Sequence, residues 1–592
     1  MAKQKAKSPQ TKSYTANPLF DYALLASFAL FIIFFTTFKI SGDDDVFWHL
    51  ATGKYVMETG HVPSQDIFGY VTQGQEWMPF EWGWDVITYN IYKPFGYTGL
   101  SVFRTIIFLL IFLIYYLILR KFKVSATLSV FMFIVITFGI IDRLTPRPHI
   151  ISLLFFVLLL YLIISFRYFN RKNIYLYFIP LIFLVWANMH MGIIAGILLL
   201  GIYVITEVIS YFSKSSLSTK EVPALDKKQL LLLIIIFAVS LLVMLINPNG
   251  FATYIYAYSH TKMKLLETIN EWRSPFDKMF SGFVGNIYKI LVVGGAITLY
   301  YALKKKDLFF ALIYIGFAFY SVRAVRFTVD YIIIIAIFVT VAVNFIIINL
   351  RNRGVSTFIS DKPVFKVALT ILLLFFTFSI PNDNLYLKTL EYYRISGFGI
   401  NSDFIPTQMF DFMKENKITE IGEHPLNHFG TGGYLVWNFP GTKNFIDSRN
   451  LNDNIFNEYN GLISKKPGFE KKLNDYGIDY VLYLAPDLTR APQEMQSTII
   501  SYLSQKNDEW KLVFWDDKSF LFVRNIPKFK EVIDKNEYKY ITPFNIVYQP
   551  QSVEKGFQNN KEEFKNELNR HKNLEPNGAF INSVLNKYQS KL

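Results

Sequence analysis

The chain has 592 residues, of which 52% are hydrophobic, and its mean hydropathy is +0.27. The apolar residues are gathered into long runs, which is typical of a membrane protein that crosses the bilayer several times. The formal net charge of +14 comes largely from basic clusters between these runs. Such clusters orient a membrane protein, so we expect no nucleic-acid partner. Because the chain has no cysteine, disulfides, thiolate metal sites and cysteine nucleophiles are excluded.

The apolar runs predict a polytopic α-helical membrane domain over residues 1–385. A helix needs about 20 apolar residues to cross a ~30 Å hydrocarbon core, and about eleven segments approach that length. The basic N-terminus leads into the first run without a signal-peptide cleavage motif, so we expect it to be retained as a span. The predicted spans are 22–38, 100–119, 126–141, 150–166, 174–188, 192–211, 230–246, 287–303, 308–320, 329–350 and 367–380.

Basic residues fill alternate connections between the predicted spans, as expected of cytoplasmic loops. The N-terminus is therefore predicted to be cytoplasmic, and everything after residue 380 is predicted to lie outside the cytoplasmic (inner) membrane. The other connections hold acidic, aromatic and histidine residues, so function is expected on the outer face. The basic connections are the N-terminus, 120–123, 167–172, 214–228, 304–306 and 351–366.

The first outer loop, 39–99, opens with three adjacent carboxylates, Asp43, Asp44 and Asp45. Neighbouring carboxylates at a membrane boundary repel one another and are costly to desolvate, which indicates a cation, a proton or a basic substrate nearby. A solvated loop with a helix N-cap is the alternative. Acidic and aromatic residues continue over 76–85, where the tryptophans suit either the membrane interface or stacking on sugars.

The later outer connections carry arginines, histidines and a glutamate at the ends of spans. The fixed fork of an arginine suits phosphate, although contact with ordinary headgroups would explain each arginine taken singly. Because these residues share one side of the bilayer, we expect them to converge on a cavity that opens to the outer leaflet. They are Arg143, Arg147, His149, His190, Glu271, Arg273, Arg323 and Arg326.

A series of short motifs links these positions. In the membrane part they are Asp45-x-x-Trp48-His49, Gly60-x-x-Pro63-x-x-Asp66, Glu81-Trp82, Arg147-Pro148-His149, Asn188-x-His190, Asn247-Pro248-x-Gly250 and Glu271-Trp272-x-Ser274-Pro275. The soluble part adds Gly432-Gly433-Tyr434-Leu435 and Phe445-Ile446-Asp447-Ser448-Arg449. Together these motifs resemble bacterial membrane proteins related to the GT-C glycosyltransferases. The resemblance implies a polyprenyl-phosphate or polyprenyl-pyrophosphate sugar donor and an essential acidic residue in the first outer loop.

The resemblance places the catalytic carboxylate among Asp43, Asp44 and Asp45, and it favours Asp45 because this residue keeps the spacing to Trp48-His49. Asp45 would deprotonate or orient the acceptor. A divalent Mg²⁺ or Mn²⁺ among Asp43, Asp45 and His190 is a further hypothesis. The predicted phosphate-binding residues are Arg143, Arg147, Arg323 and Arg326. The predicted substrate-binding residues are Trp48, His49, Glu81, Trp82, His149, His190, Glu271 and Arg273.

Shorter apolar runs interleaved with charges predict an extracytoplasmic α/β domain over 386–526. The glycines of 430–433 are interpreted as a turn that opens a helix rather than a phosphate loop. Asp447 and Arg449 either pair with each other or face the membrane cavity. A polar helical tail, 527–592, faintly resembles the end of a tetratricopeptide repeat and is expected to pack on its neighbour or on a partner. Strands are predicted at 418–421, 444–447, 479–484, 511–514 and 520–523, and a helix at 469–476.

The leading hypothesis is a glycosyltransferase that moves a sugar or glycan from a polyprenyl-linked donor to an acceptor glycan, lipid or protein on the outer face. Its other partner is the lipid bilayer. A transporter or flippase of lipid-linked glycans is one alternative, because polar residues inside the membrane suit it equally. A non-catalytic assembly protein on a GT-C scaffold is another, because a fold does not fix an activity.

Overall fold

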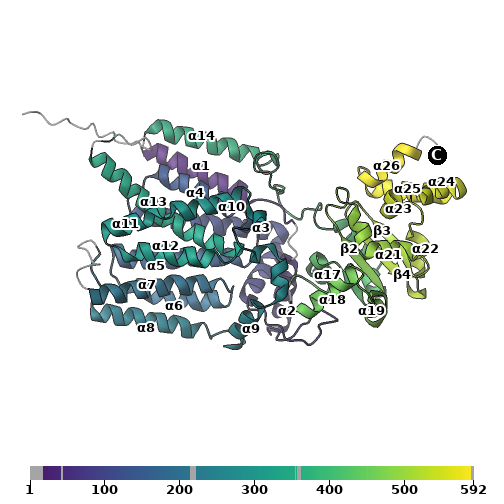
Figure 1. Cartoon of the computed structure of the whole chain (residues 1–592), viewed down its shortest axis with the longest axis horizontal. Coiled ribbons are helices and arrows are strands. Elements are labelled where there is room, and N and C mark those ends of the chain that lie inside the picture. The colour runs from purple at the N-terminus through teal and green to yellow at the C-terminus, as the bar shows by residue number, and fades with distance from the viewer. Residues whose placement is uncertain are drawn as a thin grey trace, which may run out of the picture.

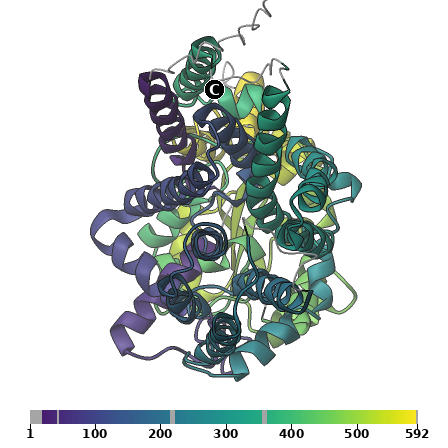
Figure 2. The ribbon, with the colours of Figure 1, turned by 90° about the vertical axis from the view of Figure 1, so that its left-hand side faces the viewer.

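The computed structural model describes residues 18–41, 45–213, 222–353, 355, 362–449 and 451–588. Asp43 and Asp44 lie outside these residues. Figure 1 shows the long helices side by side at one end of the molecule and a mixed α/β region at the other, and Figure 2 views the long helices almost end-on.

Each predicted span forms helix. The helices are α1 (Pro18–Thr36), α3 (Trp82–Lys121), α4 (Ala126–Gly139), α5 (His149–Ile164), α6 (Ile174–Ala187), α7 (Ile193–Ser213), α8 (Lys227–Val243), α10 (Phe283–Gly294), α11 (Ile297–Lys305), α12 (Leu308–Ser321), α13 (Thr328–Asn352) and α14 (Pro363–Ser379). Six stretches in the described part of the chain are long and apolar enough to cross a membrane: Pro18–Thr36, Trp82–Lys121, His149–Phe169, Ile193–Ser213, Phe283–Lys305 and Val325–Asn352. The protein is thus a multi-pass membrane protein, and the count of eleven spans stays a prediction.

The helices of the bundle pack through aromatic and branched side chains. The ring centroids of Phe28 and Phe112 are 5.0 Å apart in an edge-to-face arrangement, and Phe133 packs 5.3 Å from both. These contacts join α1, α3 and α4 into one apolar core. Edge-to-face aromatic pairs contribute free energy in addition to the burial of apolar area, so this core stabilises the packing of the three helices.

The first outer loop is largely helical. Asp45 begins α2 (Asp45–Thr59), and α3 begins at Trp82, well before its predicted span. Gly96 interrupts α3 with a φ of +56°, a conformation that favours glycine, two residues after Pro94. The break divides α3 into an outer segment, which packs on α2, and an inner segment in the bundle.

Two outer connections fold over the same end of the bundle. One contains α9 (Ala252–His260) and three 3₁₀ turns, Lys264–Thr268, Asn270–Trp272 and Lys278–Phe280. The other contains the 3₁₀ turn Val325–Phe327. The backbone N–H of Val325 donates to the carbonyl oxygen of Arg273 at 2.9 Å, so the two connections are joined directly.

The domain that is predicted to be extracytoplasmic, called the outer domain, contains a four-stranded sheet in the order β1-β2-β4-β3. The strands are β1 (Pro425–Asn427), β2 (Tyr480–Leu484), β3 (Trp510–Trp515) and β4 (Ser519–Arg524). β1 lies parallel to β2, whereas β4 is antiparallel to both β2 and β3. The helices before the last strands are α15 (Thr407–Glu415), α16 (Ile418–Ile421), α17 (Gly432–Asn438), α18 (Asp453–Ile463), α19 (Phe469–Asp475), α20 (Gln493–Ser497) and α21 (Ile499–Gln505).

Most of the predicted elements of this domain are confirmed, and two strands are wrong. The strands at 479–484, 511–514 and 520–523, the helix at 469–476 and the helix-opening turn at 430–433 are present. Residues 418–421 form the short helix α16 after Lys417, whose φ of +53° turns the chain. Residues 444–447 make a single bridge, Gly69 to Asn444, because this segment turns towards the first outer loop rather than joining the sheet.

The C-terminal region is helical, as predicted, and packs on the outer domain. Phe564, Leu568 and Ile581 share one hydrophobic core with the strand residues Val481 and Phe520. The expectation that the tail packs on its neighbour is therefore confirmed. Its helices are α22 (Lys530–Asn536), α23 (Pro543–Tyr548), α24 (Pro550–Asn559), α25 (Lys561–Leu574) and α26 (Ala579–Tyr588).

Candidate active site

Asp45 stands at the junction of three parts of the chain. Its Oδ2 forms an ion pair with Nη2 of Arg147, from the second outer connection. Its Oδ1 accepts hydrogen bonds from Oγ of Ser448, in the outer domain, and from Nε1 of Trp48 at 3.2 Å. The predicted catalytic aspartate and a predicted phosphate-binding arginine are therefore in direct contact.

Glu271 draws further arginines to the same place. Its Oε2 lies 2.9 Å from Nη2 of Arg143, and its Oε1 lies 3.5 Å from Nη1 of Arg147. Arg326 covers the neighbouring Trp272, with 4.4 Å between the guanidinium carbon and the ring centroid. Burial alone would raise the pKa of Glu271, but the charges of Arg143, Arg147 and Arg326 outweigh it and hold that pKa well below its usual range.

Glu81 lies between two imidazoles. Its Oε2 is 3.7 Å from Nε2 of His49, and its Oε1 is 3.6 Å from Nε2 of His190. Burial and the nearby Asp45 raise the pKa of Glu81 to about 8, although Arg326 and Arg147 act in the opposite direction. Because the charges of Asp45, Arg147 and Arg326 all act on Glu81, it belongs to the same cluster of charged residues.

The two imidazoles are oriented by different partners. Nδ1 of His49 lies 2.5 Å from Oδ1 of Asp85. Nδ1 of His190 accepts the backbone N–H of Gly192 at 3.0 Å and faces Oγ of Ser152 at 2.8 Å. Burial, followed by neighbouring positive charge, lowers the pKa of both histidines, so both are neutral at pH 7.

Two other predicted site residues hold the loops in place. Nε1 of Trp82 donates to Oδ1 of Asn188 at 2.9 Å, which ties the start of α3 to the connection before α7. Nε2 of His149 donates to the carbonyl oxygen of Arg143 at 2.8 Å and closes the turn that carries the arginines. Both contacts fix the loops that carry the charged residues.

Arg323 and Arg273 have other partners. Arg323 is exposed, and its guanidinium lies over the Phe319 ring at 5.1 Å. Nη1 of Arg273 lies 2.9 Å from Sδ of Met279. Their predicted roles with phosphate and substrate stay predictions.

The hypothesis of a divalent metal among Asp43, Asp45 and His190 stays a prediction. Among residues 18–41, 45–213, 222–353, 355, 362–449 and 451–588, no group of three or more His, Asp or Glu side chains is placed to hold a metal ion. The oxygens of Asp45 are engaged by Arg147, Ser448 and Trp48. Asp43, the third predicted ligand, lies outside the described residues, so we derive no step through a metal.

Two members of the cluster were missed by the sequence analysis. Asp85 follows Glu81 by four residues at the start of a helix, so both could have been expected on one helix face. Ser448 lies 403 residues from Asp45, and no local pattern indicates that contact. The alternative left open for Asp447 and Arg449 is resolved in favour of pairing, since Nη2 of Arg449 lies 2.7 Å from Oδ2 of Asp447.

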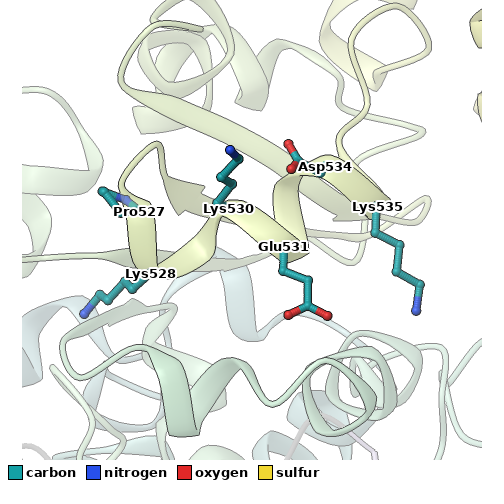
Figure 3. A pocket seen from close by; sticks show the side chains of 6 residues that line it. All are labelled: Pro527, Lys528, Lys530, Glu531, Asp534 and Lys535. Carbon is teal, nitrogen blue, oxygen red and sulfur yellow. The ribbon is translucent and has the colours of Figure 1, made fainter.

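Two clefts of the outer domain lie apart from this cluster. One, of about 640 Å³, surrounds α22, and its charged side chains, among them Lys528, Lys530 and Glu531, point in different directions (Figure 3). The other, of about 660 Å³, lies between Tyr70 of the first outer loop and the segment around His424. The carboxylates and arginines described above line neither cleft.

No protein-family model matches the sequence, and no curated protein matches it. Solved structures do. A crystal structure of the Archaeoglobus fulgidus oligosaccharyltransferase tethered with an acceptor peptide is 13% identical, with a TM-score of 0.52, over 87% of this chain and 75% of that one. The archaeal oligosaccharyltransferase AglB from A. fulgidus, in complex with an inhibitory peptide and a dolichol-phosphate, has the same identity and coverage and a TM-score of 0.53.

The chain has the GT-C fold. This assignment depends on the two archaeal structures and confirms the resemblance that the motifs predicted. ArnT from Cupriavidus metallidurans bound to undecaprenyl phosphate is also similar, at 11% identity and a TM-score of 0.46, over 86% of this chain and 98% of that one. At these identities the GT-C likeness establishes the fold, whereas the activity has to be argued from the site.

Proposed function

We propose that this protein is a glycosyltransferase that moves a sugar or glycan from a polyprenyl-phosphate or polyprenyl-pyrophosphate donor to an acceptor glycan, lipid or protein. The reaction takes place on the extracytoplasmic face of the inner membrane. The observation that carries the proposal is the contact of Asp45 with Arg147, which also reaches Glu271 beside Arg143. A carboxylate and several arginines at one end of a membrane bundle suit transfer from a lipid phosphate.

The arginines supply the charge that a departing phosphate needs. Arg143, Arg147 and Arg326 all lie close enough to Glu271 to lower its pKa, so they form one positive region. Because a guanidinium binds phosphate oxygens through two parallel N–H groups, Arg147 would exchange its carboxylate partners for the donor phosphate. The archaeal oligosaccharyltransferase of the same fold was solved in complex with a dolichol-phosphate, which supports a lipid phosphate as the ligand here.

Asp45 would act next to the phosphate. When Arg147 moves to the donor, Oδ2 of Asp45 loses its ion-pair partner and becomes available to the acceptor, while Ser448 and Trp48 continue to hold Oδ1. The sequence analysis assigned this residue to deprotonate or orient the acceptor. The bonds to its Oδ1 favour the orienting role, because they fix the direction in which the carboxylate points.

A test compares lipid-linked intermediates and surface glycans by mass spectrometry in a strain that lacks the protein, complemented with wild type, Asp45→Asn or Asp487→Asn. Asp487 is a matched control because its side chain is 76% exposed in the outer domain. We expect the donor to accumulate, and the glycan to be missing or shortened, without the protein and with Asp45→Asn only. Full activity of a folded, inserted Asp45→Asn protein would refute the role of Asp45.

The rival functions give different results in reconstituted vesicles. A transferase releases free polyprenyl phosphate or pyrophosphate. A flippase moves the intact glycolipid across the bilayer without changing it, and an assembly protein does neither.

A further inference from the structure

Among the residues that the structure describes, Glu81 is the carboxylate of the cluster whose side chain has no close hydrogen bond. Its two oxygens face Nε2 of His49 at 3.7 Å and Nε2 of His190 at 3.6 Å, and 15% of its side chain is exposed. Asp45, in contrast, is held by three donors. A group that receives a proton from a substrate needs a free lone pair and access, and Glu81 has both.

The helix start does not explain this placement. Glu81 occupies the N-cap position of α3, where an acidic side chain commonly accepts a hydrogen bond from a backbone N–H of the first turn. Its side chain makes no such bond and points to the imidazoles instead. The cap of α3 is therefore left without its usual side-chain bond, while the carboxylate stays at the reaction centre.

The hydrogen bonds of the two histidines determine what they present to Glu81. Nδ1 of His49 shares a hydrogen bond of 2.5 Å with Oδ1 of Asp85, which holds the ring with Nε2 towards Glu81. Because Nδ1 of His190 accepts from the backbone of Gly192, the proton of neutral His190 is on Nε2. One oxygen of Glu81 thus faces the N–H of His190, and the other faces Nε2 of His49.

We propose that Glu81 is the catalytic base that takes the proton of the acceptor, with His49 and Asp85 as positioning residues behind it. The assignment rests on the proposed glycosyl transfer. The acceptor's O–H or N–H bond breaks and its proton goes to an oxygen of Glu81. The acceptor atom bonds to the anomeric carbon, and the bond from that carbon to the phosphate oxygen breaks, so that the electron pair leaves with the polyprenyl phosphate. Glu81 then passes its proton to water.

His49 and Asp85 fix the position of the group beside Glu81. The hydrogen bond between Nδ1 of His49 and Asp85 orients the imidazole ring, so that Nε2 of His49 faces Oε2 of Glu81. Asp85 is fully buried and His49 is almost fully buried, so the pair is shielded from competing water. His190 contributes an N–H that stabilises the ionised form of Glu81 before it accepts the proton.

The test uses full-length protein in vesicles, with total lipid extract from the strain lacking the protein as the donor source, and measures release of polyprenyl phosphate between pH 5.5 and 9. The variants are Glu81→Gln, Glu81→Asp and His49→Gln. The matched control is Glu58→Gln, since Glu58 is 61% exposed on α2 and pairs only at 3.9 Å with Lys54. Native mass spectrometry with undecaprenyl phosphate measures binding of the lipid product separately.

We expect Glu81→Gln to lower kcat by about 10²- to 10⁴-fold while undecaprenyl phosphate binding stays within about twofold of wild type. Glu81→Asp should recover part of kcat, His49→Gln should change the shape of the pH profile, and Glu58→Gln should match wild type. Wild-type kcat in Glu81→Gln, or a parallel loss of lipid binding, would overturn the assignment. A wild-type protein that releases neither polyprenyl phosphate nor polyprenyl pyrophosphate overturns the proposed transfer itself, and the assignment of Glu81 with it.

Discussion

Arg449 fixes the outer domain to the first outer loop, and replacing it should cost several kcal/mol of stability. Nη1 donates to Oδ1 of Asp66 at 2.7 Å, while Nε and Nη2 donate to Asp447 at 2.7 to 3.0 Å. The guanidinium also lies over Trp77, 4.4 Å from its ring centroid. Arg449→Leu would leave two buried carboxylates without their counterion, since Asp66 is 2% exposed and Asp447 is 4% exposed.

Removing one partner of a buried ion pair typically costs about 3–5 kcal/mol. For a folded unit of about 200 residues, each kcal/mol lowers Tm by about 2–4 °C, so Arg449→Leu should lower the first thermal transition by roughly 6–20 °C. The assay is intrinsic-fluorescence thermal unfolding of the purified protein in detergent. Arg490→Leu is the matched control, because Arg490 is 78% exposed and lies 3.7 Å from Asp487.

A second variant separates lost charge pairing from lost packing. Arg449→Leu combined with Asp447→Asn removes one of the stranded charges, so part of the lost stability should return. The reasoning is refuted if Arg449→Leu shifts Tm no more than Arg490→Leu does, or if the second substitution makes the protein less stable still.

Three further predictions follow from the site. Burial and a neighbouring carboxylate raise the pKa of Glu81 to about 8, so its basic form becomes more populated as the pH rises. We expect the wild-type transfer rate to rise through pH 8 and this rise to be absent in Glu81→Gln. Arg326→Ala should reduce transfer by about tenfold or more, because it removes charge beside the phosphate region, whereas Arg323→Ala should change it less than about threefold, as measured by donor consumption in vesicles. A Cβ on Gly53 would lie 2.1 Å from a backbone oxygen of α3, so Gly53→Ala should lower both Tm and transfer, whereas Gly201→Ala, which has open space at its Cβ, should leave both unchanged.

The outcome of the sequence analysis differs between local and distant features. The strands over 479–484, 511–514 and 520–523 were predictable because each is a short apolar run with a turn on either side. The segment 418–421 reads as a strand by its isoleucines, but four residues are too few to distinguish a strand from one helical turn. The bend at Lys417, with its φ of +53°, decides for the helix, and a lysine at this position does not predict a positive φ.

The same division applies to the candidate site. Asp45, Arg147 and Glu271 could be nominated because acidic and basic groups at span ends have few uses other than chemistry or interfacial anchoring. Which of these residues contact one another could not be predicted. The contacting residues are separated by 102 to 403 positions in the sequence, and their contacts depend on how the bundle packs. Ser448 shows this most clearly, since a serine beside an aspartate and an arginine carries no local signal.

In the proposed transfer, the charges of the cluster would couple donor binding to chemistry. Arg143, Arg147 and Arg326 all act on the carboxylate of Glu271, and Arg147 also pairs with Asp45, so the described residues form a region rich in positive charge. An anionic donor is attracted by that region, because opposite charges attract strongly where water is largely excluded. Once the phosphate occupies the arginines, their effect on Glu81 is reduced, and its carboxylate becomes a stronger base at the moment when an acceptor can use it.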